Sequence, residues 1–266
     1  MFEEEQLLLF DDAPYFTPPP FAPAGSKRWI QVAVNRAPDL LLEALRSPLG
    51  LEASAQITWR SPREAENFRE YRDMGALRQL GIHSLPKRTL AAFWPEGGPV
   101  HDALGKVSDG QLLFLEAKAH IGEIFTPGTR ATQSSRKLID KSLNEARHHF
   151  APQSQVAWSN LGYQCANRLA FHYLIHVLNE LPSHMVFLYF NGAREMSNAP
   201  GSEQEWKRPI RYLHQRLGLP DNFQAPGVHT VFFDVSLLTE FAEIPPAPEP
   251  TIWQPWHHKL IDSFKE

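Results

Sequence analysis

The sequence has little cysteine and lacks a long apolar run. One of its 266 residues is cysteine, Cys165, which excludes an intramolecular disulfide and any cysteine-based zinc site. No stretch approaches the roughly 18 uncharged apolar residues that a membrane-spanning helix requires, so no membrane partner is expected. The acidic beginning of the chain argues against a signal peptide. A reducing, cytoplasmic location is the simplest expectation.

Basic charge is not in excess either. The formal net charge is -4 and the isoelectric point is about 6.3. Any affinity for nucleic acid must therefore come from a local patch or from a partner protein. The densest basic stretch, residues 130–149, contains Arg136 and Lys137. A solvated helix face has the same composition, so both interpretations stay open.

The signature motifs of several common enzyme classes are also missing. The chain has no glycine-rich P-loop and no GxSxG motif, which argues against a nucleotide triphosphatase and a common serine hydrolase. It has no HExxH motif and no His/Cys spacing typical of a zinc site.

Helical and strand-like apolar patterns alternate between two proline-rich ends. We expect a flexible tail over residues 1–26, one domain over residues 27–240 and a proline-rich extension over residues 241–266. The predicted helices span residues 38–48, 61–80, 134–149, 162–180 and 202–216. The predicted strands span residues 89–94, 99–107, 111–120, 185–190 and 228–235. This order predicts an α/β fold with a mixed central sheet flanked by helices.

The most informative stretch places an aspartate opposite a carboxylate and a lysine across a predicted hairpin. Asp102 precedes a turn at residues 108–110, and an apolar run then ends at Glu116 and Lys118. Residues two apart in a strand share a face, so Glu116 and Lys118 point the same way, and strand pairing brings Asp102 beside Glu116. A divalent metal between the two carboxylates would offset their burial. The alternative is a surface ion pair on an edge strand, although the apolar run before Glu116 suits a covered central strand better.

This arrangement of Asp102, Glu116 and Lys118 resembles the active-site motif of the PD-(D/E)xK nuclease superfamily. The resemblance implies a restriction-endonuclease-like core and Mg²⁺- or Mn²⁺-dependent hydrolysis of phosphodiester bonds. It also implies that Asp102, Glu116 and the carbonyl of Ala117 bind the metal, while Lys118 orients the attacking water. His101 stands where a proline often precedes the aspartate.

Further residues acquire roles through the same resemblance. Many members add a glutamate from the helix before the first core strand, and Glu70 is the favoured candidate, although a surface role is open to it. RecB-like branches use a glutamine on the helix after the ExK strand, which Gln164 matches in position. A core glutamine bonded to backbone is an equal alternative for Gln164. With Arg168 one turn later, and with Arg136 and Lys137, it forms the candidate set for contacts with nucleic acid.

Two shorter stretches add to this interpretation. Residues 167–170 together with residues 186–190 look like an uncharacterised bacterial family with this nuclease core, a likeness that would cover most of residues 55–240. Near the N-terminus, Gln6, Leu7, Leu9 and Phe10 resemble the QLxLF peptide that docks on the bacterial sliding clamp. Packing of that segment on the protein's own body is the alternative.

The sequence therefore predicts a metal-dependent nuclease that hydrolyses DNA, in repair or replication, with RNA as an alternative substrate. Two other hypotheses stay open. One is a catalytically inactive nuclease-fold adaptor or DNA-binding module. The other is an α/β enzyme that uses the same metal on a small phosphorylated molecule. A wide basic cleft would favour DNA, whereas a closed pocket would favour the small molecule.

Overall fold

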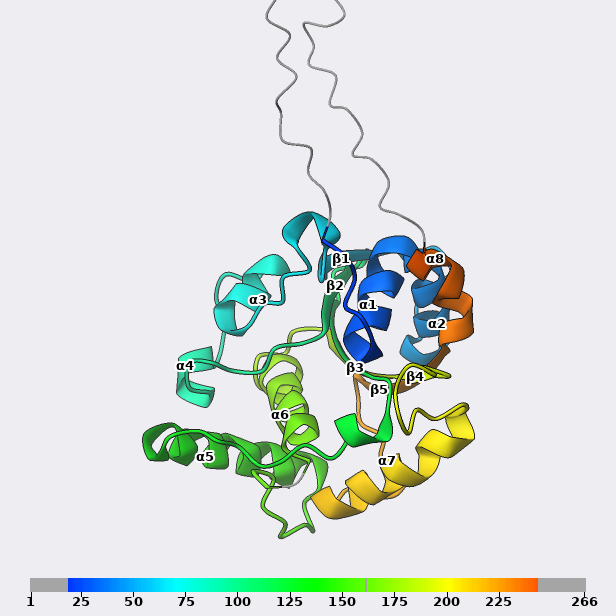
Figure 1. The fold of residues 1–266 in the computed structure, drawn as a ribbon. Coiled ribbons are helices and arrows are strands. Elements are labelled where there is room, and N and C mark those ends of the chain that lie inside the picture. The colour runs from blue at the N-terminus through cyan, green and yellow to red at the C-terminus, as the bar shows by residue number, and fades with distance from the viewer. Residues whose placement is uncertain (1–18, 161, 244–266) are drawn as a thin grey trace, which may run out of the picture.

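A five-stranded mixed sheet lies at the centre of the computed structural model, which describes residues 19–160 and 162–243 (Figure 1). The strands follow one another across the sheet in chain order: β1 (Ile57–Ser61), β2 (Ala103–Val107), β3 (Leu112–Lys118), β4 (Ser183–Asn191) and β5 (Val228–Asp234). The first three are antiparallel, and β3, β4 and β5 run parallel. The predicted α/β fold with a mixed sheet flanked by helices is confirmed.

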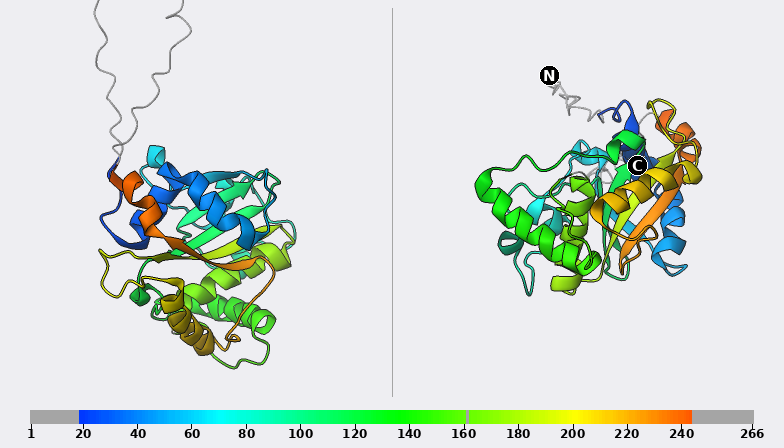
Figure 2. Two further views of the ribbon diagram at one scale, coloured as in Figure 1. Left: turned by 90° about the vertical axis from the view of Figure 1, so that its right-hand side faces the viewer. Right: turned by 90° about the horizontal axis from the view of Figure 1, so that it is seen from below.

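Helices cover both faces of the sheet (Figure 2). One face packs against α1 (Gly25–Arg36), α2 (Pro38–Leu49) and α8 (Thr239–Glu243). The other packs against α3 (Asp73–Gln79), α4 (Leu90–Phe93), α5 (Gln133–Phe150), α6 (Tyr163–His172) and α7 (Glu203–Leu217). The segment η3 (Tyr173–Leu178) continues α6 as a π-helix. Three 3-10 helices complete the elements: η1 (Glu64–Glu66), η2 (Ile121–Glu123) and η4 (Val235–Leu238).

Strand β3 is the best covered strand of the sheet. All seven of its residues are buried, because β2 and β4 flank it and helices cover both its faces. Leu112 and Phe114 belong to the core beside α6, whereas Leu113, Leu115 and Ala117 belong to the core beside α1 and α2. The predicted alternation of faces is therefore correct, and the edge-strand alternative is wrong.

Two predictions between residues 61 and 94 are wrong. Instead of one helix over residues 61–80, the chain finishes β1, forms η1 and begins α3 at residue 73. Asn67 and Phe68 both adopt positive φ angles, which interrupts any continuous helix. Residues 89–94 form α4 rather than a strand, and the Thr89 hydroxyl accepts the Ala92 N–H at its start. The first strand of the sheet therefore comes from residues 57–61.

The ends of the domain also differ slightly from the prediction. Helix α1 already begins at Gly25, inside the stretch predicted as a tail, and α8 extends to Glu243. The predicted docking segment, residues 6–10, lies outside the described residues. Within the described ranges, no helix is long and apolar enough to cross a membrane.

Candidate functional site

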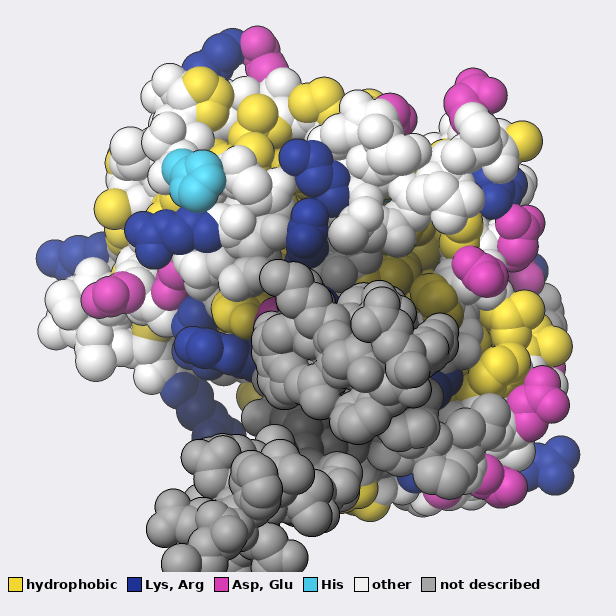
Figure 3. Space-filling model, turned by 90° about the horizontal axis from the view of Figure 1, so that it is seen from above, with side chains coloured by type: hydrophobic (Ala, Val, Ile, Leu, Met, Phe, Trp, Pro, Cys, Tyr) yellow, Lys and Arg dark blue, Asp and Glu magenta, His cyan; other side chains and the backbone are white. Residues whose placement is uncertain are grey.

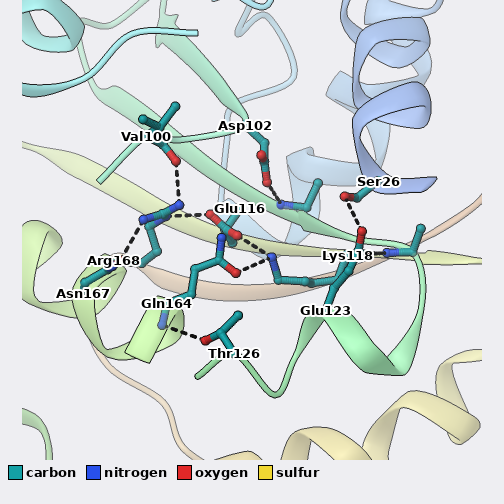
Figure 4. A network of polar contacts seen from close by, with 12 residues as sticks. Ser26, Val100, Asp102, Glu116, Lys118, Glu123, Thr126, Gln164, Asn167 and Arg168 are labelled. Carbon is teal, nitrogen blue, oxygen red and sulfur yellow. Dashed lines mark hydrogen bonds and ion pairs between the residues drawn. The ribbon is translucent and has the colours of Figure 1, made fainter. Parts of the chain in front are cut away.

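The predicted aspartate lies beside the predicted carboxylate–lysine pair (Figure 4). Asp102 immediately precedes β2, and its N–H donates to the carbonyl of Leu115 at 2.9 Å. Its carboxylate oxygen Oδ2 accepts the Ala117 N–H at 2.7 Å. These two bonds hold Asp102 across from Glu116, as the hairpin pattern predicts.

Glu116 is a fully buried carboxylate with a cation on each oxygen. Its side chain is 1% exposed, Oε1 pairs with Lys118 Nζ, and Oε2 accepts Arg168 Nε at 2.6 Å. Burial alone would raise the pKa of Glu116, but the charges and hydrogen bonds of Arg168 and Lys118 outweigh it, so the pKa falls below its usual value. Glu116 is therefore ionised at neutral pH.

Lys118 is held at its tip by two acceptors. In addition to Glu116, its ammonium donates to Gln164 Oε1 at 3.0 Å. Gln164 opens α6, where its own N–H donates to Thr126 Oγ1 at 3.0 Å. The glutamine expected to order the site thus contacts the lysine directly, which favours that interpretation over a core glutamine bonded only to backbone.

Arg168 lies behind Glu116 rather than at the surface. The residue is 4% exposed, and its guanidinium also donates to the Val100 carbonyl at 2.5 Å and to Asn167 Oδ1 at 2.7 Å. The predicted contact with nucleic acid would require this group to reach solvent. The sequence did not predict that Arg168 is a counter-ion of Glu116. Its position one turn after Gln164 places the two side chains on the same helix face, which was the one signal.

The carboxyl group of Asp102 has a strongly shifted pKa. Burial, followed by the negative charge of Glu116, raises the pKa of Asp102 to about 7. Lys118, the Ala117 N–H and Arg168 oppose that shift. Perturbed pKa values of this kind cluster at functional sites, so Asp102 stays a candidate site residue.

His101 is a packing residue and not a charged one. Its ring is 0% exposed and lies 5.0 Å from the ring centre of Phe114 and 5.1 Å from that of Phe171. Burial, assisted by Arg168, lowers the pKa of His101 well below its usual value. The neutral ring therefore fills the core next to Asp102.

The other predicted site residues lie apart from this network. Glu70 lies between η1 and α3, outside the helix that was expected to carry it, and pairs with Lys27 at 3.2 Å. Arg136 on α5 pairs with Asp140 and bonds Ser159, and Lys137 beside it is exposed. Within the described ranges, no hydrogen bond or ion pair joins these three residues to Asp102 or Glu116.

One site neighbour was not predicted at all. Glu123, in η2 after β3, accepts the Ala119 N–H at 2.6 Å and the Ser26 hydroxyl at 2.9 Å. It thereby connects the end of the ExK strand to the beginning of α1. The only signal in the sequence was its place three residues after His120, a spacing typical of a capping box.

The space around Glu116 and Lys118 is very small. The cavity that they line with Gln164 and Cys165 measures about 10 Å³, room for about one water molecule. A larger hollow of about 1130 Å³ lies at the ends of β4 and β5, lined by Arg28, Gly192, Asp234 and others, and Glu116 and Lys118 do not line it. Of the three predicted residues, Asp102 is half-buried, whereas Glu116 and Lys118 are buried.

The oxygen donors at the site suit a hard divalent cation in their chemistry. Mg²⁺ is commonly held by one or two carboxylates together with water and substrate oxygens, and Asp102 with Glu116 supplies two. Among residues 19–160 and 162–243, no group of three or more His, Cys, Asp or Glu side chains has a metal-binding arrangement.

Comparison with known proteins adds no assignment, because no family model, curated protein or solved structure matches the chain.

Proposed function

We propose that the protein is a metal-dependent nuclease that hydrolyses phosphodiester bonds in DNA, with a PD-(D/E)xK-type site. The observation that carries the proposal is the bond from the Ala117 N–H to Asp102, which holds that carboxylate beside the Glu116–Lys118 pair. The element order also supports it. An antiparallel β1–β2–β3 meander, two helices and a parallel β4 resemble the core that this superfamily implies.

In this proposal Asp102, Glu116 and the Ala117 carbonyl hold one Mg²⁺ or Mn²⁺ ion. The metal would supply Lewis acidity and lower the pKa of a bound water. Because both oxygens of Glu116 already contact cations, Glu116 must share one of them with the metal. Asp102, with one oxygen engaged by Ala117, offers its other oxygen.

Lys118 orients the attacking water and neutralises charge that develops on the phosphate. Gln164 and Glu116 fix its ammonium from two sides, which reduces the reorganisation needed during the reaction. One charge contact at about 4 Å and an effective dielectric near 20 is worth roughly 4 kcal/mol before desolvation. Loss of Lys118 should therefore slow cleavage by about three orders of magnitude.

The cavity at Glu116 and Lys118 is neither the wide basic cleft expected for DNA nor a pocket large enough for a small phosphorylated molecule. Small-molecule sites are usually clefts of roughly 300–1,000 Å³, whereas the cavity at Glu116 and Lys118 measures about 10 Å³. A polynucleotide can present one phosphate to the surface beside Asp102 without entering a pocket.

The test is cleavage of single-stranded, double-stranded and forked DNA with Mg²⁺, Mn²⁺ or EDTA. Wild type is compared with Asp102→Asn and Lys118→Met. Matched controls are Asp109→Asn, an exposed aspartate in the same hairpin, and Lys141→Met, an exposed lysine on α5. We expect metal-dependent cleavage that both site variants lose and both controls keep.

Equal cleavage by the site variants and the wild type would reject the proposal. Absence of cleavage on every DNA, with a folded protein that still binds metal, would favour the adaptor hypothesis.

A further inference from the structure

Four exposed arginines lie on the segment between β1 and the end of α3. We refer to residues 63–78 as the arginine segment; its exposed arginines are Arg63, Arg69, Arg72 and Arg78. The sequence interpretation did not use them, because a helix with interspersed acidic residues was expected there.

Every acidic side chain of the arginine segment already has a partner. Glu64 pairs with Arg36 at 2.6 Å, and Glu70 pairs with Lys27 at 3.2 Å. Glu66 accepts the Tyr71 hydroxyl at 2.5 Å and pairs at 3.8 Å with Arg63 of the same segment. Asp73 accepts the N–H groups of Gly97 and Gly98. Two of these four charges are therefore balanced by cations from α1, which leaves the local potential positive.

The arginine segment borders the candidate site on two sides. Arg72 forms a backbone bridge with Val100, which precedes Asp102 by two residues and whose carbonyl accepts Arg168. Glu70 pairs with Lys27, the neighbour of Ser26, which bonds Glu123 at the end of the ExK strand. The arginine segment is therefore connected to the site in two places. Residue 72 contacts the stretch that leads to Asp102, and residue 70 is connected through the beginning of α1 to Glu123.

The conformation of the segment is held in place before any ligand arrives. Phe68 is 6% exposed, and its ring lies 5.4 Å from that of Phe21. The Arg69 guanidinium lies 5.1 Å from the centre of the Tyr71 ring. Asn67, Phe68 and Asp73 have positive φ angles, a conformation that costs energy and that surrounding contacts must stabilise. The arginines are thus presented by a preorganised loop.

We propose that the arginine segment binds the sugar–phosphate backbone of DNA next to the phosphate that is cleaved, with Arg69 and Arg72 as its main contacts. This inference rests on the proposed function, because it assumes a polynucleotide substrate. Guanidinium groups pair well with phosphate oxygens. On the face seen in Figure 3, Lys and Arg side chains predominate toward the α3 and α4 side, and Asp and Glu toward the side of α1 and α8.

The proposed DNA contact lies on a different surface from the one that the sequence predicts, which is the surface of α5. On α5, Arg136 already pairs with Asp140 at 3.2 Å, and among the described residues no hydrogen bond or ion pair joins Arg136 or Lys137 to Asp102. If the arginine segment binds DNA, substitutions in that segment should weaken binding. If α5 binds DNA, substitutions in α5 should weaken it instead.

The test measures DNA binding in EDTA, so that no cleavage occurs. A short fluorescein-labelled duplex and its single strand are titrated by fluorescence anisotropy at several salt concentrations. The variant Arg69→Gln/Arg72→Gln is compared with the matched variant Arg136→Gln/Lys137→Gln and with wild type. Because all four side chains lie at or near the surface, melting temperature and circular dichroism should confirm that each variant is folded.

We expect the arginine-segment variant to bind about tenfold or more weakly, with the slope of log K against log salt reduced by roughly 2. The α5 variant should match wild type. A normal slope in the arginine-segment variant, or a loss confined to the α5 variant, overturns the inference.

The two proposals fail in distinguishable ways. If wild type cleaves DNA but the arginine-segment variant keeps its salt slope, the surface is wrong and the nuclease stands. If wild type binds through this segment and never cleaves, the nuclease is wrong and the surface stands.

Discussion

The two ends of the parallel strands bury ionisable groups in opposite ways. At the carboxyl end of β3, Glu116 stays charged because Lys118 and Arg168 pair with it. At the amino ends of β4 and β5, four histidines gather, and within the described part of the chain no buried carboxylate pairs with them. The His172 and His176 rings stack with centres 4.8 Å apart, and His184 Nδ1 lies 2.9 Å from His229 Nε2. The β3 end is stabilised by opposite charges, whereas the histidine rings at the other end are buried in their neutral form.

Asp102 and the histidines respond to pH in opposite ways, whereas Glu116, whose pKa lies below its usual value, responds in the same direction as the histidines. Burial lowers the pKa of His172 to about 3 and, with the charge of His229, the pKa of His184 to about 4. These rings contribute stability above their normal pKa that is lost as the pH falls. The pKa of Asp102, in contrast, is raised to about 7, so its contribution to stability is present at low pH and lost as the pH rises. The histidines therefore reduce the free energy of unfolding toward low pH, and Asp102 reduces it toward high pH.

The largest expected effect comes from removing the counter-ion of Glu116. Arg168→Met leaves a buried carboxylate with Lys118 alone, and breaking such a pair costs about 3–5 kcal/mol of unfolding free energy. Urea denaturation measures this loss. If the site takes up a divalent cation, Mn²⁺ should raise the melting temperature of Arg168→Met more than that of wild type, because the metal replaces the missing charge.

The control for that prediction is Arg147→Met, which removes a second mostly buried arginine whose partner is Asn144 and not a carboxylate. It should show no extra stabilisation by Mn²⁺. Equal Mn²⁺ effects in all three proteins would mean that Glu116 does not bind the ion.

The next effect separates activity from stability at Asp102. Asp102→Asn should abolish cleavage. The gain in unfolding free energy of this variant over wild type should be about 2 kcal/mol larger at about pH 8 than at about pH 5. The reason is that the carboxyl group, with its pKa raised to about 7, loses its proton in the folded state over this range. Urea denaturation at both pH values measures the difference. A stabilisation that does not change with pH would argue that Asp102 is solvated like an ordinary surface carboxylate.

At the opposite end, the histidines predict acid sensitivity. His184→Asn keeps a hydrogen-bonding side chain but removes a group that must be charged on unfolding in acid. Between about pH 6.5 and pH 4.5, the variant should lose about 1 kcal/mol less unfolding free energy than wild type. His83→Asn serves as a control, since His83 is exposed. The same pH slope in wild type and His184→Asn would show that the pair is protonated in the folded protein.

The smallest effect is expected for Glu70, the predicted helper of the metal. Its pair with exposed Lys27 is worth about 0.2–1 kcal/mol at most, so Glu70→Gln should change stability little. Because Glu70 pairs with Lys27 and not with Asp102 or Glu116, we expect its loss to change cleavage less than about tenfold. A fall of several orders of magnitude would instead assign Glu70 to the metal, as the resemblance implies.

Local patterns in the sequence were sufficient for the hairpin and for the placement of Asp102 across from Glu116. The turn at residues 108–110 joins β2 and β3 directly, and the alternation of faces in β3 follows from strand geometry. Asp102 could thus be placed opposite Glu116 without knowledge of the rest of the chain. Helix periodicity likewise sufficed for α5 and α7, whose amphipathic patterns are long.

Residues 57–80 could not be predicted in this way, because their structure depends on a distant partner. Strand β1 forms by pairing with β2, more than forty residues later, and that pairing outweighs the local preference for a helix from Ser61 onward. The arginine segment owes its place beside the site to the same pairing.

The chain's own residue pattern therefore determines an α/β protein in which an aspartate meets an ExK strand, because both features come from contacts between near neighbours. The tertiary structure alone decides that Arg168 occupies the second oxygen of Glu116 and that Glu70 lies beside Lys27. Those contacts join α6 to β3 and a loop to α1, and their geometry depends on how separate elements pack, which no short stretch of sequence encodes.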